Sequence, residues 1–340
     1  MASALARWIE TRPEGLYIKP GDFFIDPLKP VNRAVISHGH SDHARPNHHH
    51  VLATIETLAI MKSRLGEGAG QVHQPTPLGV TTRIGDVRVR LEPAGHVLGS
   101  AQIVLEYAGN RIVYSGDYKR AVDPTCIGFE PILCDVFITE ATFGLPVFRH
   151  PKATDEINKL LHSHGLFPDR CHVVGCYSLG KAQRVVALLR QAGYDRPIYI
   201  HGALHALCDL YEKHGIALGK LLPATAGPKG IPRNAFRGEI VIAPPSAIAD
   251  RWARRLPDPV VAMASGWMRV KQRARQRGVE LPLIISDHAD WDELLATLDD
   301  VDAPEVWVTH GREEALVHAA VAKGIDAKAL TLIGYDEAEN

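Results

Sequence analysis

Short apolar runs that stop at polar clusters dominate the first 145 residues of the chain. This pattern predicts strands at 23–25, 34–36, 87–91, 103–105, 112–114 and 136–138. Gly109-Asn110 lies between two of these runs and is a hairpin signal. One helix is predicted near 55–65, where Gly66 ends it. The first part of the chain is therefore expected to be mainly sheet.

From about residue 150 strands and helices alternate. The predicted helices lie at 155–164, 178–191 and 203–214, and the predicted strands at 172–175, 198–200, 240–243 and 260–263. Such alternation is typical of parallel βαβ units with helices on both faces of a sheet. Residues 222–238 are rich in Pro and Gly and predict a surface loop. The expected remainder is strand 283–285, helix 290–298, strand 306–308, helix 313–323 and strand 330–333. The fold class expected from this pattern is α/β.

Composition excludes several classes of protein. The 340 residues are 46% hydrophobic and 23% charged, which are ordinary globular values. No apolar run approaches the roughly 18–20 residues that span a bilayer, so no membrane association is expected. The amino-terminal residues lack a secretory signal pattern, and the five cysteines show no CxxC spacing. We therefore expect a cytoplasmic protein with reduced thiols.

Charge is unevenly distributed although the formal net charge is only −1. Residues 228–280 carry 11 Lys and Arg against 4 Asp and Glu. A solvated basic face is one interpretation, and a surface that follows a phosphate backbone is the other. Arg269, Lys271 and Arg273 begin a series that continues to Arg275 and Arg277 at every second position. That period would place the series on one face of an extended segment and makes it a candidate nucleic-acid contact.

Histidine is the unusual residue of this sequence. Six of the 18 histidines fall between His38 and His50. His38, His40, Asp42 and His43 follow the predicted strand 34–36, and a loop can turn such closely spaced side chains toward one metal ion. A chance surface cluster is the alternative. The run 48–50 is expected to be only a polar turn, because three consecutive residues cannot share a face.

Three more residues stand where an apolar run ends: His96, Asp117 and His310. Each alone would be an ordinary hydrogen-bonded turn residue. As a set with the His38–His43 segment, they predict a metal centre built from His and Asp. Zn²⁺ is the expected metal, with Mn²⁺ or Fe²⁺ as alternatives.

The sequence resembles the metallo-β-lactamase superfamily over essentially its whole length, through Asp26, the His38–His43 segment, His96 and Asp117. It is similar in particular to the β-CASP branch, whose markers match Glu140, His288 and His310. The resemblance implies an αββα sandwich with an inserted β-CASP domain, a small parallel sheet flanked by helices. The expected domains are 1–148 and 283–340 for the sandwich and 149–282 for the insertion.

The resemblance also implies roles for the site residues. Two divalent metal ions are expected per chain. One would take His38, His40, His96 and Asp117, and the other Asp42, His43, His310 and the bridging Asp117. Asp26 would orient a ligand histidine, and the expected catalytic residues are Asp26, Asp42, Glu140 and His288. His288 paired with Glu140 is the predicted general acid, although it could instead bind a phosphate oxygen.

Within the branch the chain looks most like the bacterial ligase-associated DNA exonucleases. This implies a 5′-to-3′ exonuclease on single-stranded DNA in DNA repair, with DNA as substrate and a DNA ligase and a helicase as possible partners. Ser178, Gly180 and Lys181 are candidates for a 5′-phosphate seat at a helix start, or simply a helix cap with an exposed lysine. Ser265 and Trp267 could contact a base, or Trp267 could only pack.

Three other functions remain open. A β-CASP ribonuclease, resembling the mRNA 3′-end cleavage endonuclease or RNase J, would use the same phosphate chemistry. A small-molecule hydrolase of the superfamily disagrees with the 192 residues between Asp117 and His310 and with the presence of Glu140 and His288. A nucleic-acid-binding scaffold without catalysis disagrees with the intact set of expected ligands.

Overall fold

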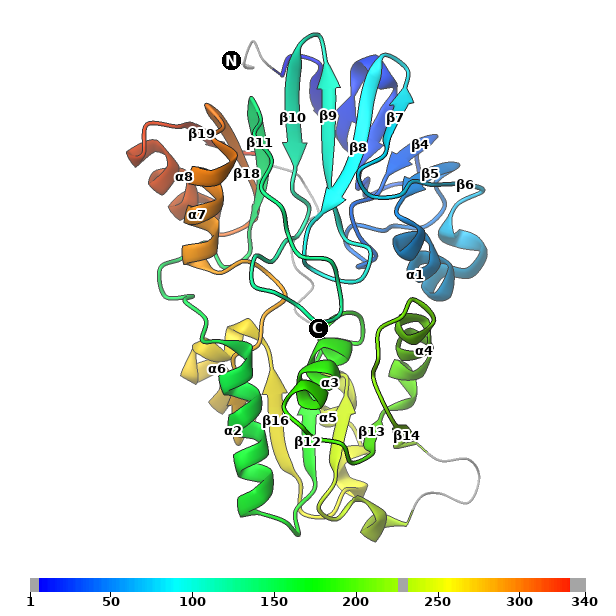
Figure 1. The fold of residues 1–340 in the computed structure, drawn as a ribbon, viewed down its shortest axis with the longest axis vertical. Coiled ribbons are helices and arrows are strands. Elements are labelled where there is room, and N and C mark those ends of the chain that lie inside the picture. The colour runs from blue at the N-terminus through cyan, green and yellow to red at the C-terminus, as the bar shows by residue number, and fades with distance from the viewer. Residues whose placement is uncertain (1–5, 226–231, 331–340) are drawn as a thin grey trace. The chain divides into compact units, whose positions relative to one another are not determined.

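The fold is taken from a computed structural model that describes residues 6–225 and 232–330 (Figure 1). The described chain forms two compact units. The first comprises residues 6–147 and 288–330, and the second comprises residues 148–287 apart from 226–231. In these residues no helix is both long enough and apolar enough to cross a bilayer.

One sheet of the first unit is formed entirely by the beginning of the chain. Its described strands are β1 (Ile9–Arg12), β2 (Gly15–Ile18), β3 (Phe23–Ile25), β4 (Arg33–Val35), β5 (His50–Ala53) and β6 (Val72–Pro75), in that order. The pairs β1–β2 and β2–β3 are antiparallel, and the pairs from β3 to β6 are parallel. Because β3 and β4 run the same way, the residues that follow them, Asp26 and Ser37, emerge at one edge.

The second sheet of this unit combines residues from both ends of the chain. Its order in the described residues is β19-β18-β11-β10-β9-β8-β7. The strands are β7 (Thr81–Ile84), β8 (Val87–Pro93), β9 (Ala101–Tyr107), β10 (Asn110–Tyr114), β11 (Val136–Ala141), β18 (Glu305–Gly311) and β19 (Asp326–Ala329). Strands β7 to β10 are antiparallel, whereas β10, β11, β18 and β19 are parallel.

Side chains of the second sheet point alternately to its two faces, and each face has its own apolar core. In β10, Ile112 and Tyr114 join the apolar core between the sheets, and Val113 joins the core on the other face. In β11, Ile138 and Phe137 divide in the same way. Successive strand residues point to opposite faces, so a continuous apolar run indicates a sheet covered on both sides.

Helices cover the two outer faces of the first unit. The helices α7 (Trp291–Val301) and α8 (Glu313–Ala322) bury Leu294, Leu298 and Leu316 against the second sheet. The helix α1 (Ile55–Leu65) buries Leu58 and Met61 against the first sheet. The resulting layer order is α, β, β, α, which is the expected sandwich (Figure 1). Each helix therefore supports the sheet whose strand ends carry the candidate ligands.

The second unit contains a parallel sheet. In the described residues its order is β14 (Leu221–Pro223), β13 (Ile198–Ile200), β15 (Ile240–Ala243), β12 (His172–Gly175), β16 (Val260–Ala264) and β17 (Leu281–Leu283). Its α-helices are α2 (Ala153–Leu166), α3 (Lys181–Gln191), α4 (His205–Lys213), α5 (Pro245–Ala249) and α6 (Lys271–Gln276). The strand-helix alternation expected from residue 150 onward is therefore present.

Short 3-10 helices punctuate both units. They are η1 (Lys19–Gly21), η2 (Gly66–Ala69), η3 (Gly202–Leu204), η4 (Arg233–Phe236), η5 (Ala253–Arg255) and η6 (Gly266–Arg269). The helix predicted at 203–214 is divided into η3 and α4, which is common where a helix begins with a tighter turn.

The structure corrects several predicted boundaries. The strand predicted at 283–285 is β17 at Leu281–Leu283, which pairs with β16, and the second unit continues to residue 287. The final strand is β19 at Asp326–Ala329, and the predicted residues 331–333 lie outside the described part. The hairpin turn is formed by Ala108 and Gly109, one residue earlier than expected. The predicted polar turn at 48–50 contains a buried His48, and His50 already belongs to β5.

Candidate metal centre

A buried carboxylate at the end of β3 supports the histidine-rich loop. Asp26 accepts hydrogen bonds from the Ser37 backbone N–H at 2.7 Å and from the Ser37 hydroxyl at 2.5 Å. Its Oδ2 also lies 2.8 Å from Nδ1 of His43, so it accepts the Nδ1 proton and leaves Nε2 facing the site. Asp26 therefore fixes the ring orientation of His43 by a hydrogen bond, and its role behind a metal ligand stays a prediction.

Ser37 is a supporting residue that the sequence alone did not reveal. Its oxygen lies 3.0 Å from Nδ1 of His38. Because the Ser37 hydroxyl donates to Asp26, its oxygen is left to accept the Nδ1 proton of His38. This leaves Nε2 of His38 as a lone-pair donor. The only signal in the sequence was its place between a strand and the first histidine.

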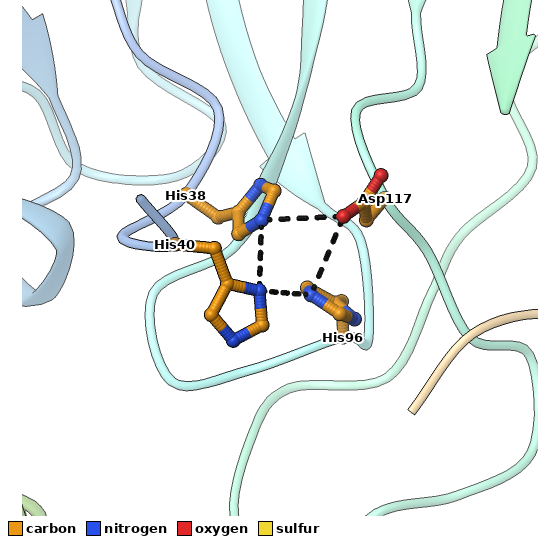
Figure 2. Close-up of side chains that lie close together, drawn as sticks. All are labelled: His38, His40, His96 and Asp117. Atoms are coloured by element: carbon orange, nitrogen blue, oxygen red, sulfur yellow. Dashed lines mark hydrogen bonds and ion pairs between the residues drawn. The ribbon is translucent and has the colours of Figure 1, made fainter. Parts of the chain in front are cut away.

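Four candidate ligands converge in the first unit. Nδ1 of His40 lies 3.1 Å from Nε2 of His38 and 3.0 Å from Nε2 of His96. Figure 2 shows these three rings and Asp117 turned toward one another, from the loops after β4, β8 and β10. One atom from each of the four residues lies within 4.8 Å of all the others. The first ligand set expected from the sequence is thus assembled.

Asp117 lies between the two expected ligand sets. Its Oδ2 is 3.4 Å from Nε2 of His38 and 3.7 Å from Nε2 of His96, on one side. The same oxygen is 3.5 Å from Nε2 of His43, which itself lies 3.9 Å from Oδ2 of Asp42. One carboxylate oxygen therefore reaches ligands of both sets, as a bridging group must.

His310, the remaining member of the second expected set, lies beside His43 on another strand. Its ring stacks on that of His43 with centroids 5.2 Å apart. Its backbone φ is +62°, an uncommon value for a residue other than glycine, and Gly311 follows at +83°. The pairing of β11 with β18 shifts register between Thr139 and Ala141, so this irregular backbone lies beside Glu140. The bulge turns His310 out of the regular alternation of its strand.

The donor set fits a divalent transition metal. Zn²⁺ binds imidazole nitrogen and carboxylate oxygen at about 2.0–2.2 Å, so two ligand atoms on one ion lie roughly 3.0–3.5 Å apart. Three separations among His38, His40, His96 and Asp117, of 3.0, 3.1 and 3.4 Å, match that range, and the fourth, between His96 and Asp117, is slightly longer at 3.7 Å. Imidazole and carboxylate donors suit Zn²⁺, Mn²⁺ and Fe²⁺.

The protonation states of the ligands depend on burial and on their neighbours. Burial lowers the pKa of His38 well below its usual value and lowers the pKa of His310 to about 3, so both rings are neutral. Burial also acts to lower the pKa of His43, but Asp117, Asp42 and Asp26 outweigh it and raise that pKa to about 10. His43 must therefore lose a proton when a metal binds.

Glu140 and His288 form a carboxylate–imidazole pair beside this cluster. Nδ1 of His288 lies 2.9 Å from Oε2 of Glu140, and Oε1 of Glu140 accepts the Tyr118 backbone N–H at 2.7 Å. Glu140 is buried, and the His288 ring lies 4.7 Å from the ring of His96. Glu140 holds one nitrogen of His288 and leaves the other for chemistry near the metal ligands.

The proposed phosphate seat in the second unit has a different arrangement from the expected one. The helix α3 begins at Lys181 rather than Ser178, and Gly180 is its N-cap, with a φ of +83°. Lys181 is buried, and its Nζ lies 2.5 Å from Oδ1 of Asp287. The alternative interpretation, a helix cap with an exposed lysine, is therefore wrong in its lysine. Phosphate binding by Ser178, Gly180 and Lys181 stays a prediction.

The basic series after Ser265 is helical and not extended. Residues 266–269 form η6 and residues 271–276 form α6, so side chains two positions apart point about 200° from one another. Arg269, Lys271 and Arg273 therefore do not share the single face expected from their spacing. A helix was missed because Ala274 is the only residue of α6 that is buried.

Trp267 is packed by its own unit. The Arg273 guanidinium carbon lies 4.2 Å from the centroid of the Trp267 ring, and the Phe148 ring meets it edge-on at 5.0 Å. The Ser265 hydroxyl accepts the Trp267 backbone N–H at 3.3 Å and caps η6. Base contacts by Ser265 and Trp267 stay predictions.

Comparisons with known proteins give one matching family model and several curated relatives. A family model described as the metallo-beta-lactamase superfamily matches residues 25–170. The chain is 29% identical over 331 residues to a protein of Opitutus terrae named "probable DNA ligase", covering 95% of this chain and 31% of that protein. It is 31% identical over 144 residues to endoribonuclease YSH1 of Gibberella zeae, covering 38% of this chain and 17% of that protein.

A solved structure has a similar fold. The crystal structure of a protein of unknown function from Enterococcus faecalis V583 superposes with a TM-score of 0.55 at 13% identity, over 81% of this chain and 74% of that one. The chain spans about a third or less of the length of the two curated relatives. The matched residues include Asp26, the histidine-rich loop, His96, Asp117 and Glu140. Residues 25–170 match the metallo-beta-lactamase superfamily, and the relatives of the chain are consistent with the β-CASP branch of nucleic-acid-processing hydrolases.

Proposed function

We propose that this chain is a dinuclear-metal phosphodiesterase that degrades single-stranded DNA from its 5′ end, in DNA repair and in the cytoplasm. The observation that supports the chemistry best is the position of the Glu140–His288 pair. It lies beside a set of metal ligands that share Asp117. Phosphodiester cleavage needs both an activated water and a proton for the leaving oxygen.

The proposed role of each site residue follows from its contacts. When bound, two divalent ions would activate water and neutralise charge on the phosphate. His38, His40 and His96 would hold one ion, Asp42, His43 and His310 the other, and Asp117 both. His288 would protonate the leaving oxygen through Nε2, because Glu140 already takes its Nδ1 proton. Glu140 would also stabilise the imidazolium form that donates this proton.

The preference for DNA is supported by the extent of the comparisons. The relative named a probable DNA ligase matches 95% of this chain, whereas the endoribonuclease matches 38%. A DNA ligase is accordingly proposed as a partner, and a helicase by family resemblance. A ribonuclease is the second candidate, because the chain also matches a protein named endoribonuclease over 38% of its length.

The deciding experiment is digestion of end-labelled, sequence-matched DNA and RNA strands with added Zn²⁺ or Mn²⁺, in which product lengths are read. We expect DNA to be shortened stepwise from a 5′-phosphorylated end. Asp42→Ala should reduce the rate by about a thousandfold, because it removes an expected ligand. Asp155→Ala, an exposed carboxylate on α2, is the control and should match the wild type.

Each alternative has its own outcome. Faster cleavage of RNA would favour the ribonuclease. Internal cuts would contradict exonuclease action, and equal rates with 5′-phosphate and 5′-hydroxyl ends would contradict a 5′-phosphate seat. Unchanged nuclease rates in Asp42→Ala with metal present would contradict the metal-dependent mechanism itself.

A further inference from the structure

The short segment that follows Asp117 is hydrogen-bonded to three other parts of the first unit near the metal centre. The Tyr118 backbone N–H donates to Glu140, and its carbonyl accepts the Ala289 backbone N–H at 2.6 Å. The Lys119 backbone N–H donates to the Ala94 carbonyl at 3.0 Å, two residues before His96. A displacement of this segment would therefore move both Glu140, which holds His288, and Ala289, which follows His288.

A buried ion pair anchors that segment to the helix that follows His288. Nζ of Lys119 lies 2.6 Å from Oε2 of Glu293, with side chains only 6% and 18% exposed. The other oxygen of Glu293 accepts the Ala121 backbone N–H at 2.7 Å. One carboxylate therefore holds two residues of the segment after Asp117.

Glu293 also fixes the start of α7. Its Oε2 accepts the Asp290 backbone N–H at 3.0 Å, and its own backbone N–H donates to Asp290 Oδ1 at 3.0 Å. This reciprocal capping box starts α7 with Asp290 as its N-cap, two residues after His288. Glu293 therefore ties the segment after Asp117 to the start of the helix that follows His288, and it belongs to neither the ligands nor the Glu140–His288 pair.

We propose that Lys119 and Glu293 are positioning residues that set the place of His288 relative to Asp117, so that the proton reaches the leaving oxygen. This inference rests on the proposed phosphodiesterase function. The Lys119 ammonium is not a substrate contact, because it is buried and forms an ion pair with Glu293. A misplacement of about 1 Å can cost roughly a hundredfold in rate, which makes such an anchor consequential.

The test compares substrates that differ in their need for a proton. A DNA phosphodiester has a poor leaving oxygen, whereas the nitrophenolate of bis(p-nitrophenyl) phosphate departs without protonation. We expect Lys119→Met to lower kcat on DNA by about 10- to 100-fold, with KM unchanged, and to lower hydrolysis of the nitrophenyl ester by less than about threefold. His288→Ala should show the same division between substrates.

Two further variants protect the test against misfolding. Lys119→Met alone leaves a carboxylate buried without its partner, which is strongly destabilising. Lys119→Met/Glu293→Gln removes both charges and keeps an oxygen for the Ala121 N–H, so it should fold and still show the selective loss on DNA. Lys119→Arg keeps the charge and should recover most of the DNA activity.

A neighbouring ion pair supplies a matched control. Arg120 Nη2 lies 2.5 Å from Asp300 Oδ2 and joins the same segment to the same helix, but its partner is 45% exposed. Arg120→Met should stay within about twofold of the wild type on both substrates, because exposed pairs contribute little. An equal loss on both substrates in the Lys119 and Glu293 variants would overturn the proposal, and so would no loss.

A second measurement does not depend on turnover. Long-range ¹H–¹⁵N spectra of the Zn²⁺-loaded protein report which nitrogen of His288 carries the proton. We expect Nδ1 of His288 to carry a proton and to give one defined signal in the wild type, and we expect a mixed signal in Lys119→Met/Glu293→Gln, with the metal content unchanged. An unchanged His288 signal would refute the positioning role even if the chain proved not to cleave DNA. A wild type that shows the expected spectra but cleaves neither DNA nor RNA would refute the proposed function alone.

Discussion

Asp26 contacts no expected metal position directly, yet it determines the direction of two ligands. It accepts the Nδ1 proton of His43, and through Ser37 it also sets the ring of His38. It is fully buried and has a φ of +40°, which few residues other than glycine adopt readily. Carboxylates behind ligand histidines commonly affect metal affinity as strongly as some ligands do.

Asp26→Asn should therefore weaken metal binding without removing a ligand. An amide can still accept from Ser37 but cannot serve His43 as a charged acceptor. We expect the dissociation constant for Zn²⁺ to rise by about 10- to 100-fold, measured by competition with a chromophoric chelator. Asp22→Asn is the control, since Asp22 also has positive φ (+49°) but binds the Tyr17 hydroxyl. If both variants bind Zn²⁺ like the wild type, Asp26 has only a structural role.

At the scale of one loop, Gly95 permits the approach of the His96 loop to the segment after Asp117. Its φ is +73°, and a Cβ there would lie 2.2 Å from the Lys119 carbonyl oxygen. Gly109 in the β9–β10 turn has a similar φ of +83°, but a Cβ there would meet nothing within 4 Å. The two glycines thus separate backbone strain from loss of space.

Gly109→Ala should cost about 1 kcal/mol of unfolding free energy, from the positive φ alone. Gly95→Ala should cost at least twice as much and also lower Zn²⁺ affinity about tenfold, because His96 must shift with its loop. Urea unfolding and metal titration measure the two effects. Equal unfolding free energies for the two variants would show that the loops are not in tight contact.

The elements that sequence could predict are those with a buried face. Strands β10 and β11 were recognisable because Ile112, Val113 and Phe137 are apolar on both sides of a covered sheet. The helix α6 was not, because it buries only Ala274 and its alternating charges imitate an extended segment. The spacing of hydrophobic residues identifies a helix or a strand only when enough of its residues are buried.

The ligand set was predictable for a different reason. His38, His40, Asp42 and His43 lie within six residues, and His96, Asp117 and His310 each stand at a strand end. The pairs Lys119–Glu293 and Lys181–Asp287 were not, because their members lie far apart in the sequence and are common surface residue types. Burial, which only the fold decides, turns such residues into fixed contacts.

For the whole molecule, acid should weaken the fold through histidines that are buried as neutral rings. Burial lowers the pKa of His172 in the second unit to about 4, from its usual 6.5, and His48 in the first unit behaves in the same way. Between these pH values the unfolded chain binds protons that the folded chain does not. The free energy of unfolding therefore falls as the pH drops from 6.5 to 4.

His172→Gln should reduce that dependence by roughly 2 kcal/mol over the same interval, because glutamine has no proton to gain. Metal-free protein and denaturant unfolding at several pH values provide the measurement. His162→Gln, an exposed residue of α2, is the control and should follow the wild-type slope. A parallel slope in His172→Gln would mean that this histidine has the same pKa in the folded and unfolded chains.

The second sheet of the first unit is continuous, although the insertion separates two of its neighbouring strands in the sequence. Strand β11 precedes residues 148–287 and β18 follows them, yet the two pair directly in parallel. All the expected metal ligands belong to the first unit. Residues 148–287 could therefore be replaced by another domain, while β11 and β18 keep their pairing and the candidate ligands keep their places. Such modularity lets one hydrolytic centre be reused on different polymers, and it offers protein engineers a defined place at which to graft a new specificity.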